Sequence, residues 1–204
     1  MKSFFVTVCV LVLAVFVAGA GLAQDNQKAG EKKAASPSPE EMAAWQKAAT
    51  PGPHHAHFKD LAGAWNAECK YWMQPGTDPQ VEKMKTEYKL VFGGRYLTST
   101  LEGTMMGMPF SGMGIAGYDN VKGVHTMVWL DNMSTTLFYS EGTCSDNCSV
   151  ETHHMTQMDP MTGSEVKVKT VTRFVDNDKH VFEYFMVNPD GSEFKSMEIV
   201  YTRM

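Results

Sequence analysis

The chain lacks the short motifs that carry enzymatic chemistry in many protein families. It contains no Gly-x-Ser-x-Gly nucleophile motif, no His-Glu-x-x-His metalloprotease motif, no phosphate-binding Walker loop and no Cys-x-x-Cys pair. Isolated Asp, Glu and His residues occur in any β domain, and catalysis needs a geometry that spacing alone does not supply. We therefore expect a protein that is not an enzyme, and the sequence leaves any cofactor unknown.

Clusters of basic residues are also missing. The 204 residues carry 18 Lys and Arg against 23 Asp and Glu, for a formal net charge of −5, and the charges are spread without blocks of either sign. A nucleic-acid partner would require a basic face, so none is expected. The sequence leaves the oligomeric state open.

The apolar run at the N-terminus is shorter than the roughly 20 residues that a transmembrane helix needs. It extends from Phe4 to Val17, follows a single positive charge at Lys2, and precedes small residues that end at Ala23. This order is typical of a secretory signal peptide. We expect residues 1–23 to be cleaved, and the mature protein to be exported, periplasmic or secreted, without a stable membrane anchor.

Helical segments are few. Residues 24–37 are small, polar and charged, which predicts a disordered linker. A short helix is predicted over residues 38–50, because Ser38 suits the N-cap, Pro39 the first helical position and Glu41 a capping box. One face of that helix is expected to pack on the domain through its apolar residues at helical spacing, Met42, Trp45 and Ala49.

Residues 51–204 consist of short segments in which apolar and polar residues alternate, separated by turn residues. About ten such segments occur, and none of the connections is long enough for a parallel crossover. The predicted fold is all-β, an antiparallel up-and-down β-barrel of about ten strands behind a short N-terminal helix, since closure removes exposed strand edges. A two-sheet sandwich is the alternative, and it would usually need longer connections.

The stretch from Gly93 to Asp119 is rich in glycine. Gly112, Gly114 and Gly117 reproduce the dinucleotide-binding pattern, but they lead into a turn and another strand instead of a helix. We interpret these glycines as positions where a barrel strand bends or a neighbour approaches closely.

One strand suggests a binding function. Trp129 shares a strand face with His125, Met127 and Asp131, so all four point into the barrel if Trp129 does. Such an interior could bind a small hydrophobic or amphipathic molecule without catalysis, which is the function we favour from the sequence. A structural or interaction protein whose barrel is filled by its own side chains is one alternative.

Histidine and methionine suggest a second alternative, a periplasmic copper or zinc binder. Imidazole binds both metals, and thioethers suit Cu(I). The candidate ligands are three histidines within four residues, His54, His55 and His57, and three methionines near a strand turn, Met105, Met106 and Met108.

The cysteines have separate expectations. Cys144 and Cys148 flank a three-residue turn and could form a disulfide across a hairpin, with two free thiols as the alternative. Cys69 lies on the same strand face as Trp65, which predicts a small buried apolar residue.

Across residues 51–204 the chain resembles the bacterial family known as domain of unknown function 1579, which is regarded as lipocalin-like. The resemblance rests on these residues: Pro51-Gly52, His55, Phe58, Leu61, Gly63, Trp65, Gly93 to Leu97, Gly103, Gly107, Pro109-Phe110, Gly112, Gly114, Gly117 to Asp119, Trp129, Asp131 and Tyr201 to Arg203. It implies a calycin-type barrel in which Trp65 opens the first strand and Arg203 packs near it as a structural latch. The family implies no activity.

Overall fold

The computed structural model describes residues 36–145 and 147–204, so the expected signal peptide and nearly all of the expected linker lie outside the described residues. The strands are β1 (Gly63–Tyr71), β2 (Gln80–Val91), β3 (Tyr96–Met105), β4 (Met108–Asp119), β5 (Val124–Asp131), β6 (Phe138–Cys144), β7 (Val150–Met158), β8 (Glu165–Asp176), β9 (Lys179–Val187) and β10 (Glu193–Arg203). The helices are α1 (Pro39–Ala49), α2 (Pro53–Ala56) and α3 (Phe58–Leu61), with a short 3-10 turn, η1 (Phe92–Gly94).

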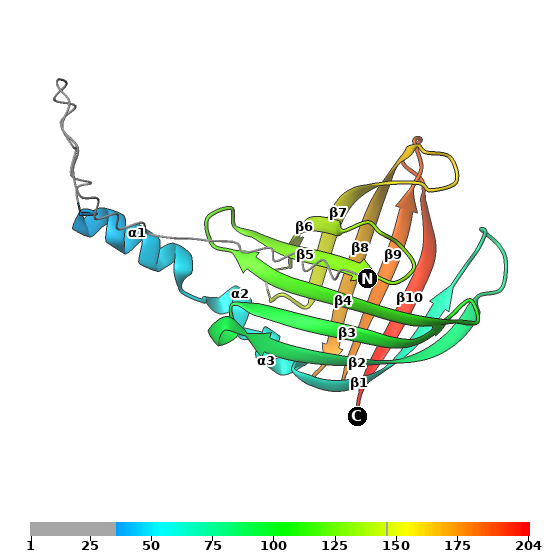
Figure 1. Ribbon diagram of the computed structural model, residues 1–204, viewed down its shortest axis with the longest axis horizontal. Coiled ribbons are helices and arrows are strands. Elements are labelled where there is room, and N and C mark those ends of the chain that lie inside the picture. Colours follow the sequence, from blue (N-terminus) through cyan, green and yellow to red (C-terminus); the bar gives the residue numbers. More distant parts are fainter. Residues whose placement is uncertain (1–35, 146) are drawn as a thin grey trace, which may run out of the picture. The chain divides into compact units, whose positions relative to one another are not determined.

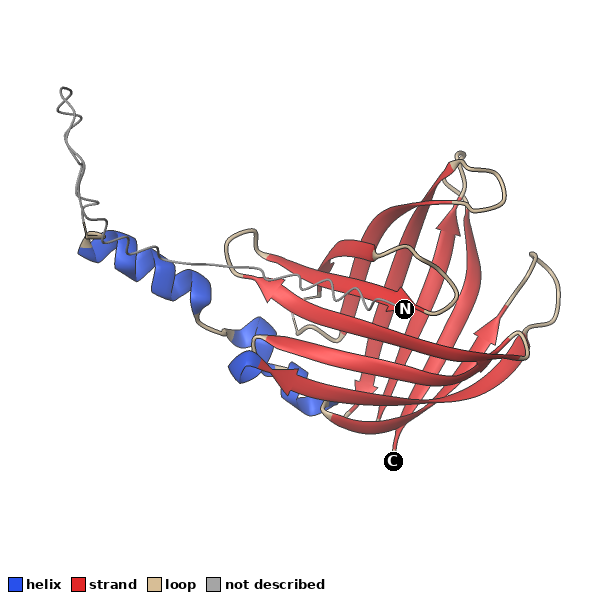
Figure 2. Cartoon of the chain, viewed as in Figure 1, coloured by secondary structure: helices blue, strands red, loops and turns tan. Residues whose placement is uncertain are grey.

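The predicted all-β barrel is confirmed. Each strand pairs antiparallel with the next in sequence, and β1 pairs with β10, which closes the barrel (Figure 1). Figure 2 shows the short helices α2 and α3 beside one end of the strands, next to β2 and β4. Among the described residues, no helix is long and apolar enough to span a membrane.

The tip between β3 and β4 is a two-residue turn. Met106 and Gly107 both have positive φ, 54° and 74°, while Met105 and Met108 pair across the strands. Turns with two positive φ values match the right-handed twist of antiparallel strands, so they suit tight hairpins. The methionines of this tip sit where β4 begins, whereas His54 of α2 stacks on Tyr118 near the other end of that strand.

Helix α1 has the predicted capping box. The Ser38 hydroxyl accepts a hydrogen bond from the Glu41 N–H at 3.2 Å, and the Glu41 carboxylate accepts one from the Ser38 N–H at 2.6 Å. The predicted packing of one face of this helix is wrong, because none of its residues is buried and Trp45 is 72% exposed. Two or three apolar residues on a short polar helix bury too little area to offset its ordering.

The end of α1 is joined to the barrel by polar contacts instead. The Asn120 side chain donates to the carbonyl groups of Ala48 and Thr50, at 3.0 and 2.8 Å, and Arg95 Nε donates to the Ala49 carbonyl at 2.9 Å. The last carbonyl groups of a helix have no partner within it, so these donors satisfy them. The sequence predicted no helix over α2 and α3, which follow directly.

The inward faces of β1 and its neighbours form the densely packed core. On β1 the alternation places Trp65, Ala67, Cys69 and Tyr71 inside, where they pack with residues such as Ile199. Cys69 is fully buried, and burial raises the pKa of its thiol to about 12. The predicted interior position of Cys69 is confirmed, and the thiol stays protonated and unreactive.

Arg203 and Trp65 face each other where β1 pairs with β10. The guanidinium group lies 4.2 Å from the centre of the Trp65 ring, in cation–π geometry. It also donates hydrogen bonds to the carbonyl groups of Ala62 at 3.1 Å and Asn177 at 2.6 Å, and it pairs with Asp178 at 2.9 Å. One side chain thus ties the last strand to the start of β1 and to the β8–β9 turn.

Replacing Arg203 by Lys should lower the free energy of unfolding by about 2 kcal/mol, because Lys keeps the charge but loses the planar fork of donors. Urea denaturation followed by circular dichroism measures the change. Arg173→Lys is the matched control, since Arg173 pairs with Glu183 on the surface and its side chain is 54% exposed. Its expected effect is below about 0.5 kcal/mol, and equal losses in the two variants would contradict the latch role.

Candidate functional site

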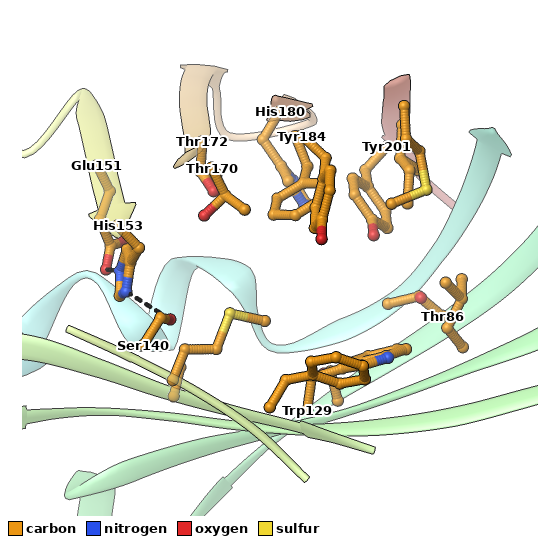
Figure 3. A pocket seen from close by; sticks show the side chains of 18 of the residues that line it. Thr86, Trp129, Ser140, Glu151, His153, Thr170, Thr172, His180, Tyr184 and Tyr201 are labelled. Carbon is orange, nitrogen blue, oxygen red and sulfur yellow. Dashed lines mark hydrogen bonds and ion pairs between the residues drawn. The ribbon is translucent and has the colours of Figure 1, made fainter. Parts of the chain in front are cut away.

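The barrel encloses a cavity of about 490 Å³. Its lining is mostly apolar and comes from nearly every strand, together with residues of α3 and the segment before it. Figure 3 shows His180, Tyr184 and Tyr201 on one side of the cavity and Trp129 on the opposite side, with His153 and Glu151 at one end. Concave apolar spaces of about 300–1,000 Å³ are typical of small-molecule sites.

The four residues predicted on the inner face of β5 do not all line this cavity. Met127, Trp129 and Asp131 do, and the Trp129 indole N–H donates to the Asp131 carboxylate at 2.9 Å. His125 is 1% exposed but lies beyond the cavity, against His54 of α2.

Glycines on β4 make room for the Trp129 ring. The register places Gly112 opposite Asp131 and Gly114 opposite Trp129. A Cβ atom on Gly112 would lie 2.3 Å from Trp129 Cζ2, and one on Gly114 would lie 3.2 Å from Cε3 of the same ring. These are close approaches of a neighbouring side chain to the strand, which only glycine allows.

His180 is the most strongly perturbed imidazole of the cavity wall. Its ring stacks on Tyr201 with centroids 4.3 Å apart, and its Nε2 lies 3.2 Å from the Tyr88 hydroxyl. Burial, together with the nearby charge of Arg203, lowers the pKa of His180 to about 3. Burial also raises the pKa of Tyr88 and of Tyr201. This part of the wall is therefore uncharged.

At the end of the barrel next to α2, four potential metal ligands come together: His54, His125, Cys144 and Cys148. The His54 ring stacks on Tyr118 of β4, with centroids 4.1 Å apart. Cys144 and Cys148 are joined by a disulfide, with Cα atoms 4.8 Å apart. Burial lowers the pKa of His54, and His125 lowers it further.

A second group, His57, His125 and Glu151, adjoins the first. Glu151 Oε1 lies 3.1 Å from His125 Nδ1 and 2.7 Å from His153 Nε2. Burial opposes the charge on Glu151, but the close approach of His125 and His153 outweighs it and holds the pKa of the carboxyl below its usual range. Among the described atoms, both ring nitrogens of His57 are buried without a hydrogen-bond partner.

The six residues predicted from the sequence as metal ligands do not form one site. His54 contacts Tyr118 near the end of β4, whereas Met105, Met106 and Met108 surround the turn at its beginning. Tyr118 lies ten positions after Met108 on β4, which corresponds to about 33 Å of strand length. Met105 and Met106 instead line the cavity, and Met108 is exposed.

His55 has a local structural role. Its Nδ1 accepts a hydrogen bond from the Gly52 N–H at 3.1 Å, which satisfies one of the free donors at the start of α2. His57 remains with the site because it lines the cavity and approaches His125 and Glu151.

Reasoning from the sequence did not identify Glu151, and it treated the two cysteines only as a hairpin disulfide. The strand pairing links the cysteines to His125, because His125 lies opposite Gly142 and the inner face of β6 then continues to Cys144. Using it requires the register, which alternation alone does not supply.

One family model and several solved structures match this chain. A family model described as "Protein of unknown function (DUF1579)" matches residues 50–203. The crystal structure of Rv2717c from M. tuberculosis is similar with a TM-score of 0.54 and 18% identity, covering 76% of this chain and 99% of that one. A redesigned β-barrel matches at a TM-score of 0.35 with 16% identity, covering 72% of this chain and 94% of its own. No curated protein matches.

Gly112→Ala should destabilise the protein by about 2 kcal/mol, because the added methyl group displaces a rigid ring. The displaced Trp129 ring should also change the intrinsic fluorescence. Urea denaturation and emission spectra measure both effects. The control is Gly52→Ala, since a Cβ there meets nothing within 4 Å; a variant at Gly112 as stable as this control would contradict the close approach.

Stability should fall as the pH drops below about 6.5. The unfolded chain then binds a proton at His180 that the native state excludes until about pH 3, so this residue alone costs about 2 kcal/mol by pH 5. His180→Gln should remove that part of the loss between about pH 7 and pH 5 in denaturation experiments. The exposed His154→Gln should leave the slope unchanged, and an unchanged slope in both would contradict this assignment.

Proposed function

We propose that this chain, which belongs to the DUF1579 family, binds a small hydrophobic or amphipathic molecule in its barrel and does not catalyse a reaction. The observation that carries the proposal is the interior cavity of about 490 Å³ with its mostly apolar lining. The family description gives no activity, and the similarity to solved structures concerns the fold alone.

The lining suits a compact molecule with an aromatic or aliphatic body. Trp129 and Met127 stand on one wall, and Phe182, Tyr184 and Tyr201 stand on others. Aromatic side chains offer large rigid surfaces, and methionine adapts to irregular shapes, so together they favour apolar ligands of varied outline.

The polar groups of the cavity favour a ligand whose polar end is uncharged. Burial raises the pKa of Tyr184 to about 12, and its hydroxyl donates to Gln157 Oε1 at 2.9 Å. His180 is held neutral by burial. The Glu151 carboxylate is already engaged by two histidines. The Asp131 carboxylate also lines the cavity and already accepts hydrogen bonds from the Trp129 indole N–H and the Met133 backbone N–H. These groups can accept or donate hydrogen bonds, but they offer no free charge to a ligand ion.

N-phenyl-1-naphthylamine, a neutral apolar dye whose fluorescence rises out of water, tests the proposal. We expect saturable binding, together with energy transfer from Trp129. Met127→Trp should weaken this binding by about tenfold or more, because the larger side chain occupies the cavity. Titration followed by fluorescence measures the affinity.

Leu130→Trp is the matched control, because Leu130 lies on the same strand and is 37% exposed. It should bind the dye as the parent chain does. Circular dichroism must show that both variants are folded, and Ala116→Phe, also in the lining, gives an independent filling variant. Dye binding that persists unchanged in both filled variants would rule out the cavity as the binding site.

A further inference from the structure

Four side chains with metal-binding atoms converge at the end of the barrel beside α2. His54 comes from α2, His125 from the start of β5, Cys144 from the end of β6 and Cys148 from the turn that follows. One atom of each, an imidazole nitrogen or a sulfur, lies within 4.8 Å of all the others. Three separate parts of the chain thus place two imidazole nitrogens and two sulfurs close together.

The three distances from His54 Nδ1 match the edges of a tetrahedral zinc site. His54 Nδ1 lies 3.3 Å from His125 Nε2, 3.7 Å from Cys144 Sγ and 3.6 Å from Cys148 Sγ. Zinc bonds of about 2.0–2.1 Å to nitrogen and about 2.3 Å to sulfur separate two nitrogens by about 3.3 Å, and nitrogen from sulfur by about 3.5 Å. We propose that the dithiol form of this protein binds one zinc ion through these four residues.

The two sulfurs are joined in the structure, so the metal site belongs to the reduced form. A thiol or phosphine reductant supplies the two electrons that open the disulfide, and the sulfurs take up two protons. Zinc then displaces both protons as it binds the thiolates. Three residues separate Cys144 from Cys148, which falls within the usual Cys-x2–4-Cys spacing of zinc sites. The Cα separation of 4.8 Å lets side-chain rotation alone open the sulfurs to the required distance of about 3.8 Å.

Glu151 contacts His125 on the side of the ring that faces away from the proposed metal ion. His125 Nδ1 is buried and lies 3.1 Å from Glu151 Oε1, yet it makes no properly aligned hydrogen bond. A metal ion on Nε2 leaves Nδ1 as the nitrogen that carries the proton, which is the donor that the carboxylate needs. Histidine ligands of zinc are commonly oriented by a carboxylate in this way. His153, which donates to Glu151 and contacts Ser140 at 3.1 Å, holds the carboxylate in place.

The group of His57, His125 and Glu151 competes for the same histidine. That group offers only three ligands, and its carboxylate is already held by His153. The cysteine-containing group has four ligands, and in it the Glu151 carboxylate keeps its present position behind His125. The observations therefore favour the cysteine-containing group. Because His57 belongs only to the other group, a variant at His57 serves as a control.

The test uses the full chain with Cys9→Ala and Cys69→Ala, so that Cys144 and Cys148 are its only thiols. A phosphine reductant opens the disulfide and becomes a phosphine oxide, with one water molecule supplying the oxide oxygen and the two thiol protons. The reductant is then removed under anaerobic conditions, and Co²⁺ is added as a coloured substitute for zinc. We expect one Co²⁺ per chain, thiolate-to-cobalt charge-transfer bands and the visible bands of tetrahedral cobalt, all abolished by Zn²⁺. The same chain with its disulfide intact should show none of these bands.

Variants separate the two metal groups. Cys144→Ser combined with Cys148→Ser should abolish the charge-transfer bands, and Glu151→Gln should weaken Zn²⁺ binding about ten- to a hundredfold. His57→Ala should leave the spectrum and the affinity unchanged. Circular dichroism establishes that each variant is folded, and the disulfide form serves as a folded control without thiols.

Two outcomes would overturn the proposal. One is the absence of thiolate-to-cobalt bands in the reduced chain. The other is metal binding that survives the loss of both cysteines and disappears with His57→Ala. Neither readout involves the cavity dye, so this site can fail while the proposed ligand-binding function stands, and the reverse is also true.

Discussion

The pairing of β1 with β10 is the interaction on which the rest of the structure depends. It joins residues near the start of the barrel to the last residues of the chain, with Trp65 opposite Arg203. Arg203 covers the Trp65 ring and binds backbone carbonyl groups of Ala62 and Asn177. Without this pairing the sheet would have two open edges and no enclosed interior, so the cavity is a consequence of closure.

The cavity exists because ten strands enclose more space than the inward side chains fill. An eight-stranded barrel is just wide enough for its own side chains, and each added strand widens the interior. Near β1 the interior is packed by large residues such as Trp65 and Phe110. On β4 the inward positions Gly112 and Gly114 carry no side chain, so the Trp129 ring lies against the backbone and leaves the centre open.

The cavity adjoins the four metal-binding residues at its end through β5 and the segment before β1. His125 and Met127 are neighbours on one face of β5, and His57 lines the cavity while approaching His125. A metal ion held by His54, His125 and the two cysteines would join α2 to β5 and to the end of β6. The two proposed sites therefore differ in chemistry but lie next to each other.

The sequence by itself determined the fold class and the orientation of single strands, because alternation with a period of two is a local property. It placed Met127, Trp129 and Asp131 on one face, and it predicted the capping box of α1. Only the tertiary structure decided which residues of different strands come together. It brought Glu151 to His125 and the two cysteines to His54, and it placed the methionine tip and His54 at opposite ends of β4. These outcomes depend on register and closure, which arise from pairing between distant strands and leave no local pattern in the sequence.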